Sequence, residues 1–310
     1  MKVEVLDSIS IDYKEMHSLL KEAFAHRSKS KVDVEIPSPQ SLEFKYRNAV
    51  GPSKLATIRC NGELVAMNGL IPMEIRNSGF PTVGWMSCDT ATHPGYQGRG
   101  LFKQCVSALE VSLPDGAFLF GFPNINSMPG FTKMGWRHLA EVDLYFSSSL
   151  LGTKKSAIVR EVDFNALNNF PPNPNGIVKS REYLIWRYDP LRGEYQVHEI
   201  SSEGSIYFVI SRKLKINGII FSLILDVISE NQLLPGKSLR KLCKVQNTFG
   251  ILLAPGIHSR LELGKNGFLR VPSFLISRKI NLAGKFLADD ADKSLTASNW
   301  NLSLGDFDAL

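Results

Sequence analysis

The chain has 310 residues, a length that permits two domains of ordinary size, each with its own core. Hydrophobic residues make up 44% of the sequence and charged residues 21%, which excludes a disordered chain and is typical of a folded globular protein. The formal net charge of +6 and the pI near 9.0 suit an anionic ligand, but Lys and Arg are interleaved with acids and form no basic stripe, so no nucleic-acid binding is expected.

The N-terminus and the apolar segments predict a cytoplasmic protein. Glu4 and Asp7 lie where a signal peptide needs an apolar core. The longest largely apolar stretch, residues 219–225, is too short to span a bilayer, so no membrane insertion is expected. The sequence does not indicate an oligomeric state.

The cysteines form no CxxC pair and no Cys/His cluster, so we expect no metal site and no disulfide framework. We expect reduced thiols that pack as small hydrophobic side chains. The four residues are Cys60, Cys88, Cys105 and Cys243.

The first half of the chain starts with a helical pattern that ends near Arg47. Asn61-Gly62 then predicts a two-residue hairpin turn, because both positions tolerate positive φ. A helix is expected over residues 101–109, and a shorter one is expected to end at Gly135. Strands are expected over residues 55–58, 64–70, 83–92, 118–122 and 139–146.

The second half repeats these landmarks in the same order. A helix ending near Arg187 precedes a hairpin turn at Glu203-Gly204, and Gly267 stands before an aromatic residue as Gly135 does. A helix is expected near residues 239–245, and strands are expected over residues 195–200, 206–211, 219–228, 250–253 and 270–276. Because the landmarks agree in type and order, the sequence predicts an internal duplication.

The two halves differ in the loop that joins the third strand to the next helix. A phosphate cradle needs glycines that bring backbone N–H groups close, a helix N-terminus aimed at the anion, and no acid nearby. Residues 93–100 meet these demands, whereas residues 229–236 contain Glu230 and a single glycine. Only the first half is therefore predicted to bind a pyrophosphate.

The order of strand, glycine-rich loop, helix, strand and short helix resembles the GNAT superfamily of acyl-CoA N-acyltransferases. Their loop signature is Gln/Arg-x-x-Gly-x-Gly/Ala. Here Gln97 and Gly100 match, whereas Phe102 replaces the last small residue. With the Phe-Pro-Asn run at residues 122–124, the close resemblance covers residues 83–146.

The resemblance implies an α+β fold of two tandem GNAT-like domains, each a mixed, partly splayed sheet flanked by helices. Residues 1–150 would bind acyl-CoA, and residues 151–310 would be a degenerate copy that binds the acceptor. The two-lobed layout is similar to family members that acylate nucleotide-linked amino sugars for surface polysaccharides. The chain would then move an acetyl or short acyl group from acyl-CoA to the amine of a dTDP- or UDP-linked amino sugar.

Two other functions remain open from the sequence. One is the same chemistry on a peptide, polyamine or antibiotic amine. The other is a CoA-binding protein that lacks catalysis.

The resemblance also implies which residues bind the cosubstrate, acetyl-CoA or another short acyl-CoA. Its pyrophosphate would lie on the N–H groups of the loop, and its pantetheine where strands 88–91 and 118–122 splay apart. A backbone N–H near Cys88 or Asp89 could polarise the thioester carbonyl. Asn124 could equally cap the next helix. The expected cosubstrate-binding residues are Cys88, Thr90, Ala91, Gln97, Gly98, Arg99, Gly100, Leu101, Phe102, Asn124 and Ser127.

Asp89 and His93 are the nearest candidates for a general base. Asp89 could equally be a buried hydrogen-bond acceptor, and for His93 a role in shaping the turn before Pro94 is favoured. An amine of low pKa would need no protein base, and this alternative is slightly preferred. Where many relatives have a tyrosine that protonates the leaving thiolate, this chain has Phe131, so Ser127, a water molecule or no group takes that role.

The second half contains an aromatic–Arg–aromatic run, Trp186-Arg187-Tyr188. Such a run could stack on a nucleotide base and contact a phosphate, or it could be a helix end packed on the sheet. In the first half, neither Cys88 nor Cys105 has a nearby base that would indicate an acyl-enzyme, so direct transfer in a ternary complex is predicted.

Overall fold

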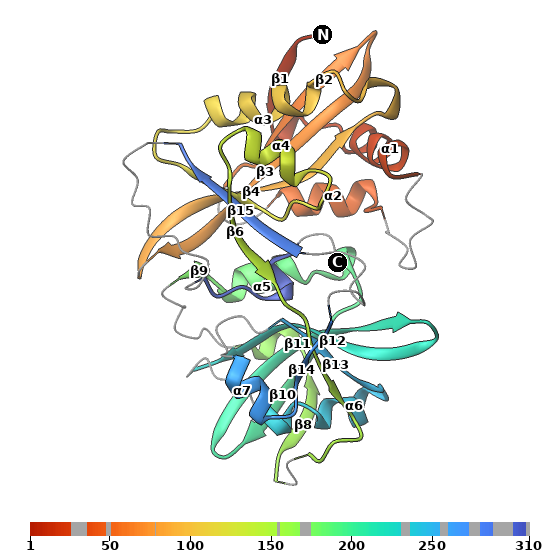
Figure 1. The fold of residues 1–310 in the computed structure, drawn as a ribbon, viewed down its shortest axis with the longest axis vertical. Helices are drawn as coiled ribbons and strands as arrows, with labels where there is room; N and C mark the ends of the chain where they lie inside the picture. The colour runs from red at the N-terminus through yellow and green to blue at the C-terminus, as the bar shows by residue number, and fades with distance from the viewer. Residues whose placement is uncertain are drawn as a thin grey trace. The chain divides into compact units, whose positions relative to one another are not determined.

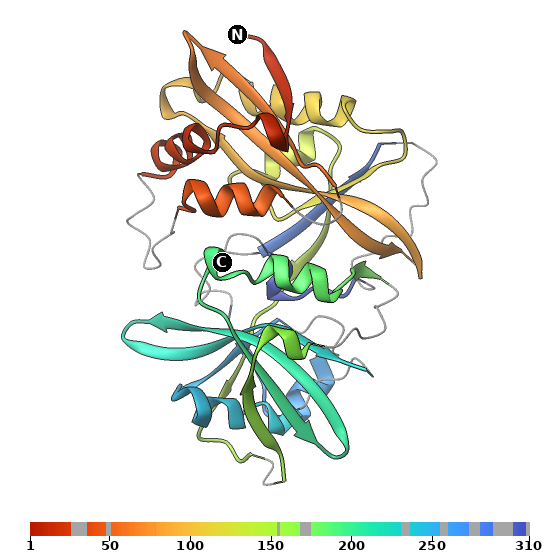
Figure 2. The same cartoon turned by 180° about the vertical axis from the view of Figure 1, so that it is seen from behind.

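The computed structural model describes residues 1–25, 36–47, 51–77, 79–153, 156–167, 175–230, 236–254, 260–272, 280–287 and 300–307. The chain forms two compact units, each built on its own sheet (Figures 1 and 2). Unit 1 comprises Met1–Ile75, Pro81–Glu141 and Ser277–Thr296, and unit 2 comprises Arg76–Phe80, Val142–Ile276 and Ala297–Leu310. Over the residues described, no helix has both the length and the apolar character needed to cross a membrane.

Unit 1 has a mixed sheet with helices on both faces (Figures 1 and 2). Its strands are β1 (Val3–Asp7), β2 (Lys54–Cys60), β3 (Glu63–Asn77), β4 (Phe80–Thr92), β5 (Phe118–Gly121), β6 (Arg137–Val142) and β15 (Ile280–Phe286). Its helices are α1 (Tyr13–Phe24), α2 (Pro39–Tyr46), α3 (Leu101–Val111) and α4 (Met128–Lys133), with 3₁₀ turns η1 (Ser8–Ser10) and η3 (Pro94–Tyr96). The strand order is β1-β2-β3-β4-β5-β15-β6, and β4 and β5 run parallel.

Unit 2 has the strand order β14-β7-β13-β12-β11-β10-β8. These strands are β7 (Tyr145–Ser148), β8 (Ile158–Val162), β10 (Gln196–Ser202), β11 (Ser205–Ile216), β12 (Ile219–Ser229), β13 (Gly250–Leu253) and β14 (Leu269–Arg270). Its other elements are β9 (Gly176–Ile177), α5 (Arg181–Arg187), α6 (Lys241–Gln246), α7 (Arg260–Lys265) and the 3₁₀ turns η4 (Phe164–Ala166), η5 (Pro190–Arg192), η6 (Gly236–Ser238) and η9 (Leu304–Asp306). The mixed α+β fold expected from the sequence is confirmed.

The predicted hairpin turns form as expected. In the first turn φ is 52° at Asn61 and 88° at Gly62, and in the second it is 53° at Glu203 and 77° at Gly204. Positive φ at both positions gives a turn whose twist matches that of the flanking strands. The two turns thus form equivalent hairpins, β2–β3 in unit 1 and β10–β11 in unit 2.

The expectation of a single strand over residues 139–146 is wrong. The strand breaks at Asp143, whose buried carboxylate accepts a hydrogen bond from Arg270 Nε at 2.9 Å. The residues before the break form β6 in unit 1, and those after it form β7, which pairs antiparallel with β13 in unit 2.

Strand β15, from the C-terminal part of the chain, pairs antiparallel with β5 and lies between β5 and β6 in the sheet of unit 1. Each unit is therefore discontinuous in sequence, which a single boundary at residue 150 does not describe. The strand expected at residues 270–276 appears as β14, and residues 273–276 lie outside the described part of the chain.

Helix α3 packs on the sheet of unit 1 through one apolar face. Leu101, Cys105 and Leu109 recur every four residues, and with Val106 they are buried where α3 contacts β1 and β2. Burying each such side chain stabilises the fold by about 1.5–3 kcal/mol. This packing holds α3 in place on the sheet, and with it the helix N-terminus that follows the glycine loop. Unit 2 has a comparable core between its sheet and helices α6 and α7.

The duplication is visible in strand register. In unit 1 the first β4–β5 pair is Gly84 with Phe118, and in unit 2 the first β12–β13 pair is Phe221 with Gly250. Counting five residues along β4 and β12 from these pairs reaches an aspartate in both units, Asp89 and Asp226. The preceding helices, α2 and α5, are both capped by a serine side chain.

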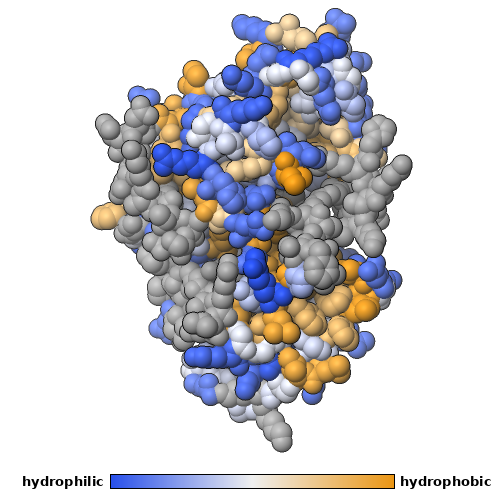
Figure 3. All heavy atoms as spheres, in the orientation of Figure 1, coloured by the Kyte–Doolittle hydropathy of each residue, from blue (hydrophilic) through white to orange (hydrophobic). Residues whose placement is uncertain are grey.

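Unit 2 also exposes apolar side chains. Ile219, Ile220 and Phe249 are each more than a third exposed, and they lie at the starts of β12 and β13. Figure 3 shows apolar side chains gathered on this unit.

Candidate active site

Strand β4 extends beyond the last pair that it makes with the shorter parallel strand β5. Their pairing runs from Gly84 with Phe118 to Ser87 with Gly121. In the part of the chain described, no further β4–β5 pair follows, although β4 continues to Thr92. Cys88, Thr90 and Ala91 therefore lie on the part of β4 beyond β5, which we call the opened edge and where the sequence predicts the pantetheine groove.

The glycine loop is open to solvent beside this edge. Gly98 and Gly100 have φ of 77° and 74°, a conformation that L side chains rarely adopt, and a Cβ on either would meet no heavy atom within 4 Å. Gly100 is the N-cap of the 11-residue helix α3, with no side-chain cap. The N–H groups at the start of α3, from Leu101 and Phe102 onward, are consequently available to an anion.

The polar side chains of the loop bond back to the loop itself. Gln97 Nε2 donates to the carbonyl of Thr92 at 3.2 Å, and Arg99 Nη2 donates to the carbonyl of Gly95 at 3.1 Å. The Arg99 guanidinium also lies 4.9 Å from the Tyr96 ring centroid. These side-chain bonds order the loop, and they occupy backbone carbonyl groups rather than backbone N–H groups.

In unit 2, the described end of the counterpart loop differs at its glycine. Gly236 has φ of 53°, but it is buried, and a Cβ there would lie 2.6 Å from Oδ1 of Asn266. The space before this glycine is thus already filled by a side chain. Residues 231–235 of the loop lie outside the described part of the chain.

His93 shapes the turn before the loop. Its Nδ1 accepts a hydrogen bond from the backbone N–H of Gly95 at 3.0 Å and so caps η3. The other ring nitrogen, Nε2, must then carry the proton, and it lies 3.5 Å from Glu22 Oε2. This geometry agrees with the turn-shaping role and offers no lone pair to an amine.

Asp89 is held by two donors that sequence reasoning missed. Its Oδ2 accepts from Lys45 Nζ at 2.8 Å and from the Tyr46 hydroxyl at 3.0 Å. The Tyr46 hydroxyl also lies 3.8 Å from Cys88 Sγ. Burial, and then the Asp89 charge, hold the pKa of Tyr46 well above its usual value, so its hydroxyl stays protonated and donates.

A signal for Lys45 was present in the sequence. Leu42, Lys45 and Tyr46 lie three and four residues apart, which places them on one face of α2. A lysine on a buried face requires an acidic partner. The partner, Asp89, lies 44 residues away and could not be assigned without the fold.

Side-chain hydrogen bonds join β4 to β3, its neighbour on the edge that faces away from β5. Asn68 is buried and donates from Nδ2 to Ser87 Oγ at 3.0 Å and to Thr90 Oγ1. Thr90 is therefore oriented by its neighbour strand at the point where β4 leaves β5.

The two departures from the family signature contact each other. The ring centroids of Phe102 and Phe131 are 5.1 Å apart, and Phe131 also packs on Trp136. A Cβ at Gly130 would lie 2.6 Å from the Phe102 ring, so a large residue fits at position 102 because residue 130 is glycine. Phe131 is buried in this aromatic cluster, and no hydroxyl is present there to protonate a thiolate.

Asn124 holds the turn that precedes α4, whose N-cap is Ser127. Its Oδ1 accepts from the backbone N–H groups of Asn126 at 2.9 Å and Ser127 at 3.1 Å, just before α4. The Ser127 hydroxyl donates to the Asn124 carbonyl at 3.3 Å. Both residues lie between β5 and the first residue of α4.

The aromatic–Arg–aromatic run of the second half is part of the core of unit 2. Trp186, Arg187 and Tyr188 are 6%, 6% and 1% exposed. Arg187 donates from Nε to the Gly305 carbonyl at 2.6 Å and from Nη2 to the Phe307 carbonyl at 2.9 Å. These contacts do not support the expected binding of a nucleotide by this run.

The buried thiols are poor nucleophiles. Burial raises the pKa of Cys105 to about 12 and also raises the pKa of Cys243. Because the thiolate is the reactive form, neither residue is suited to carry an acyl group.

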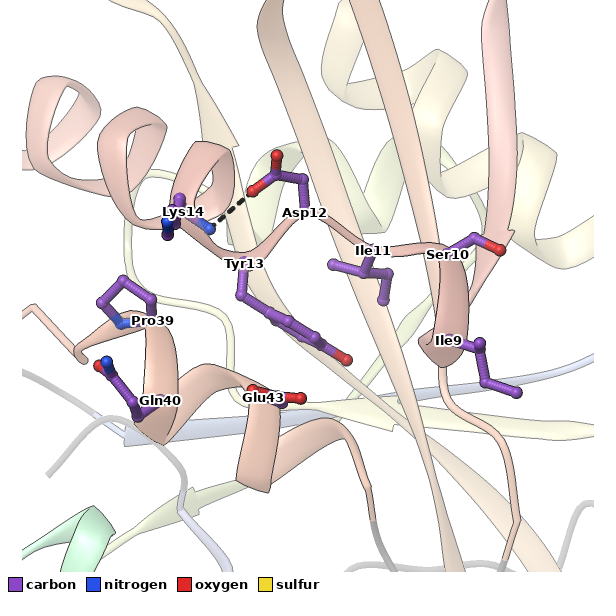
Figure 4. A pocket seen from close by; sticks show the side chains of 9 residues that line it. All are labelled: Ile9, Ser10, Ile11, Asp12, Tyr13, Lys14, Pro39, Gln40 and Glu43. Carbon is purple, nitrogen blue, oxygen red and sulfur yellow. Dashed lines mark hydrogen bonds between the residues drawn. The ribbon is translucent and has the colours of Figure 1, made fainter.

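Unit 1 has an open pocket of about 490 Å³ between η1 and the starts of α1 and α2 (Figure 4). Tyr13 lines it, donates from its hydroxyl to the Ser8 carbonyl at 2.8 Å, and lies 6.2 Å from Tyr46 between ring centroids. Asp12 caps α1 there by accepting from the Lys14 N–H. Ser10 and Gln40 add polar groups to the lining.

Residues 10–139 match the family model of the acetyltransferase (GNAT) domain. This range contains the opened β4–β5 edge, the glycine loop and helices α3 and α4. The protein thus carries a GNAT acetyltransferase domain and is an enzyme of the CoA-dependent N-acyltransferase class.

Solved structures resemble the whole two-unit fold. A probable N-acyltransferase from Enterococcus faecalis has a TM-score of 0.64 and 13% identity, covering 93% of this chain and 73% of that one. A GCN5-related N-acetyltransferase from Anabaena variabilis has a TM-score of 0.64 and 8% identity, covering 92% and 73%. Eis1 from Mycobacterium abscessus has a TM-score of 0.59 and 10% identity, covering 93% and 74%.

At these identities the similarity defines the fold alone. No curated protein sequence matches this chain significantly.

Proposed function

We propose that this protein transfers an acetyl or other short acyl group from acyl-CoA to the amine of a small molecule, by direct attack in a ternary complex. The observation that carries the proposal is the end of β4–β5 pairing at Ser87 and Gly121, beside the open loop of Gly98 and Gly100. The loop and the N-terminus of α3 would hold the pyrophosphate. The opened edge would hold the pantetheine amides and bring the thioester to residues 88–90.

In this reaction the amine nitrogen attacks the thioester carbonyl carbon, the C–S bond breaks, and the nitrogen loses a proton. We assign neither candidate as the base, because Asp89 Oδ2 is held by Lys45 and Tyr46 and His93 Nδ1 caps a turn. Water would therefore take the proton. The thiolate of CoA, with a pKa near the 8.5 or so of a free thiol, can leave without an acid, which suits the absence of a hydroxyl at Phe131.

The acceptor we propose is a nucleotide-linked (dTDP- or UDP-) amino sugar. The net charge of +6 and the resemblance to acyltransferases of such sugars support it. Because Trp186, Arg187 and Tyr188 are buried, the acceptor is instead proposed to approach from the α1–α2 face of unit 1. In the open pocket on that face, Ser10 and Gln40 suit sugar hydroxyls and Lys14 is a cation for a phosphate, beside the acids Asp12 and Glu43. A cytoplasmic location stays a prediction from the sequence.

The test is thiol release from acetyl-CoA and propionyl-CoA with a panel of amines. The panel contains dTDP- and UDP-amino sugars, the free amino sugars, spermidine, an aminoglycoside and a short peptide. We expect the highest kcat/KM with a nucleotide-linked amino sugar. Faster turnover of a cationic amine or the peptide would replace this acceptor, and CoA binding without turnover on any amine would indicate a binding protein.

A further inference from the structure

Asp89 has a left-handed backbone in the middle of a strand, with φ of 47°. It is the second residue beyond the last β4–β5 pair, Ser87 with Gly121, and so lies on the opened edge. A positive φ is uncommon for a residue other than glycine and persists only where the surrounding contacts hold it. The conformation therefore requires an anchor.

The carboxylate of Asp89 provides this anchor. The side chains of Lys45 and Asp89 are 4% and 10% exposed, so their ion pair is shielded from water. Both donors to Asp89, Lys45 and Tyr46, belong to the last turn of α2. A Cβ at Gly69 would lie 1.9 Å from the Tyr46 hydroxyl, so the tyrosine reaches the carboxylate because residue 69 is glycine.

Unit 2 has a similar anchor but a different backbone. Asp226 occupies on β12 the position that Asp89 occupies on β4, and it accepts from the Tyr188 hydroxyl. Lys179 Nζ lies 3.3 Å from the Asp226 carboxylate. Among the residues described, however, Asp226 is not one of those with positive φ. The anchor is common to both units, whereas the left-handed aspartate occurs in the unit with the open glycine loop.

We propose that Lys45 and Tyr46 are positioning residues for acyl transfer that act through Asp89. Their hydrogen bonds hold residues 88–90 in the left-handed turn, and the turn directs a backbone N–H of the opened edge at the thioester carbonyl. A fixed donor there stabilises the charge that develops on the carbonyl oxygen during attack. Asp89 thus holds the backbone and is not the base. The inference rests on the proposed acyl transfer.

Substitutions at position 89 separate a backbone role from a base. Asp89→Gly and Asp89→Ala both remove the carboxylate and leave Lys45 without it, but only glycine adopts positive φ without strain. Asp89→Asn keeps an acceptor oxygen and tolerates the left-handed conformation. We expect kcat to fall in the order Asn, Gly, Ala, with Gly roughly tenfold above Ala. Each kcat is measured well below the thermal midpoint of that variant.

The matched control is the same pair of substitutions in unit 2. Asp226→Gly and Asp226→Ala also break a buried anchor, but at a position without positive φ. Their kcat values should equal each other. A Gly-over-Ala advantage of the same size at Asp226 would show that the effect is not specific to the opened edge, and would overturn the proposal.

Two other outcomes at position 89 would also overturn it. One is an equal loss of kcat in the Asn, Gly and Ala variants of Asp89, together with loss of the acidic limb of the pH–rate profile. That result would identify Asp89 as a general base. The other is wild-type kcat in all three variants. A wild-type protein that acylates no amine would instead contradict the proposed function, and the two failures are therefore distinguishable.

A spectroscopic measurement tests the two donors directly. Acetyl-CoA labelled with ¹³C at the thioester carbonyl is bound to the wild type, to Lys45→Met and to Tyr46→Phe. We expect a downfield carbonyl shift in the wild type that is lost in Lys45→Met and reduced in Tyr46→Phe. Lys54→Met, which removes an exposed partner of Asp7, is the control and should keep the shift. An unchanged shift in Lys45→Met would contradict a positioning role.

Discussion

The two units show what a duplicated fold keeps and what it loses. Both keep the same hairpin, the same parallel strand pair and a buried Tyr–Asp hydrogen bond, Tyr46 to Asp89 and Tyr188 to Asp226. They differ at the loop before the next helix. Gly100 faces open space, whereas the side chain of Asn266 fills the space in front of Gly236. The contacts that maintain the fold are thus separable from the open loop on which cosubstrate binding depends.

The largest expected effect follows from closing the loop of unit 1. Gly100→Val should abolish acyl-CoA binding, because a β-branched residue is strained at φ of 74° and its side chain would occupy the anion site. We expect at least about a 100-fold loss of affinity by calorimetry, or about 2.7 kcal/mol.

Gly62→Val is the matched control for backbone strain. Gly62 also has positive φ and open space around it, but it lies in a hairpin turn. It should weaken stability and leave the affinity for CoA unchanged. Normal CoA binding by Gly100→Val would show that the cradle lies elsewhere.

The second prediction concerns the buried run of unit 2. Arg187→Ala removes charged hydrogen bonds to two backbone carbonyls, so it should lower the free energy of unfolding by about 3 kcal/mol. The acceptor KM, measured where the variant is folded, should not change. Denaturant unfolding and steady-state kinetics check both. A raised acceptor KM with unchanged stability would instead restore a substrate-binding role for this run.

A smaller effect is expected at the contact between the two departures from the family signature. Gly130→Ala should cost about 1–2 kcal/mol of stability, because its Cβ would lie 2.6 Å from the Phe102 ring. Phe102→Ala should relieve that clash in the double variant. A double-mutant cycle by thermal unfolding measures the coupling, and strict additivity would contradict the direct contact.

The smallest effect is a pH dependence specific to unit 2. His198 is buried, and neither ring nitrogen has a partner among the residues described. Burial lowers the pKa of His198, with Glu161 opposing the shift. The unfolded chain then binds the proton more tightly, so stability should fall as pH drops below about 6.5.

The free energy of unfolding should therefore be lower at pH 5.5 than at pH 7.5. His198→Leu should remove this part of the dependence. Urea midpoints at the two pH values provide the measurement, and an unchanged slope in His198→Leu would show that another group is responsible.

Features set by neighbouring residues were predictable from the sequence. The Asn61-Gly62 turn, the helix after Gly100 and the strand over residues 118–122 depend on local backbone preference and apolar pattern, and they formed as expected. The open loop of unit 1 could be recognised from the sequence, because its glycines and the start of the following helix lie within eight residues of one another.

Features set by distant partners were not predictable. The break at Asp143 depends on Arg270, 127 residues away, and the apolar pattern through residues 139–146 gave no sign of it. The pairing of Arg187 with the Gly305 and Phe307 carbonyls is equally remote in sequence. An aromatic–Arg–aromatic sequence is the same whether its side chains bind a ligand or pack in a core, and only the fold distinguishes the two.

The most direct test of the difference between the units is the number of CoA molecules bound per chain. Titration calorimetry of the wild-type protein with CoA should give one site per chain, because unit 1 has the open glycine loop and the corresponding glycine of unit 2 is blocked by Asn266. Two equivalent sites per chain would contradict the conclusion that unit 2 has lost the cradle.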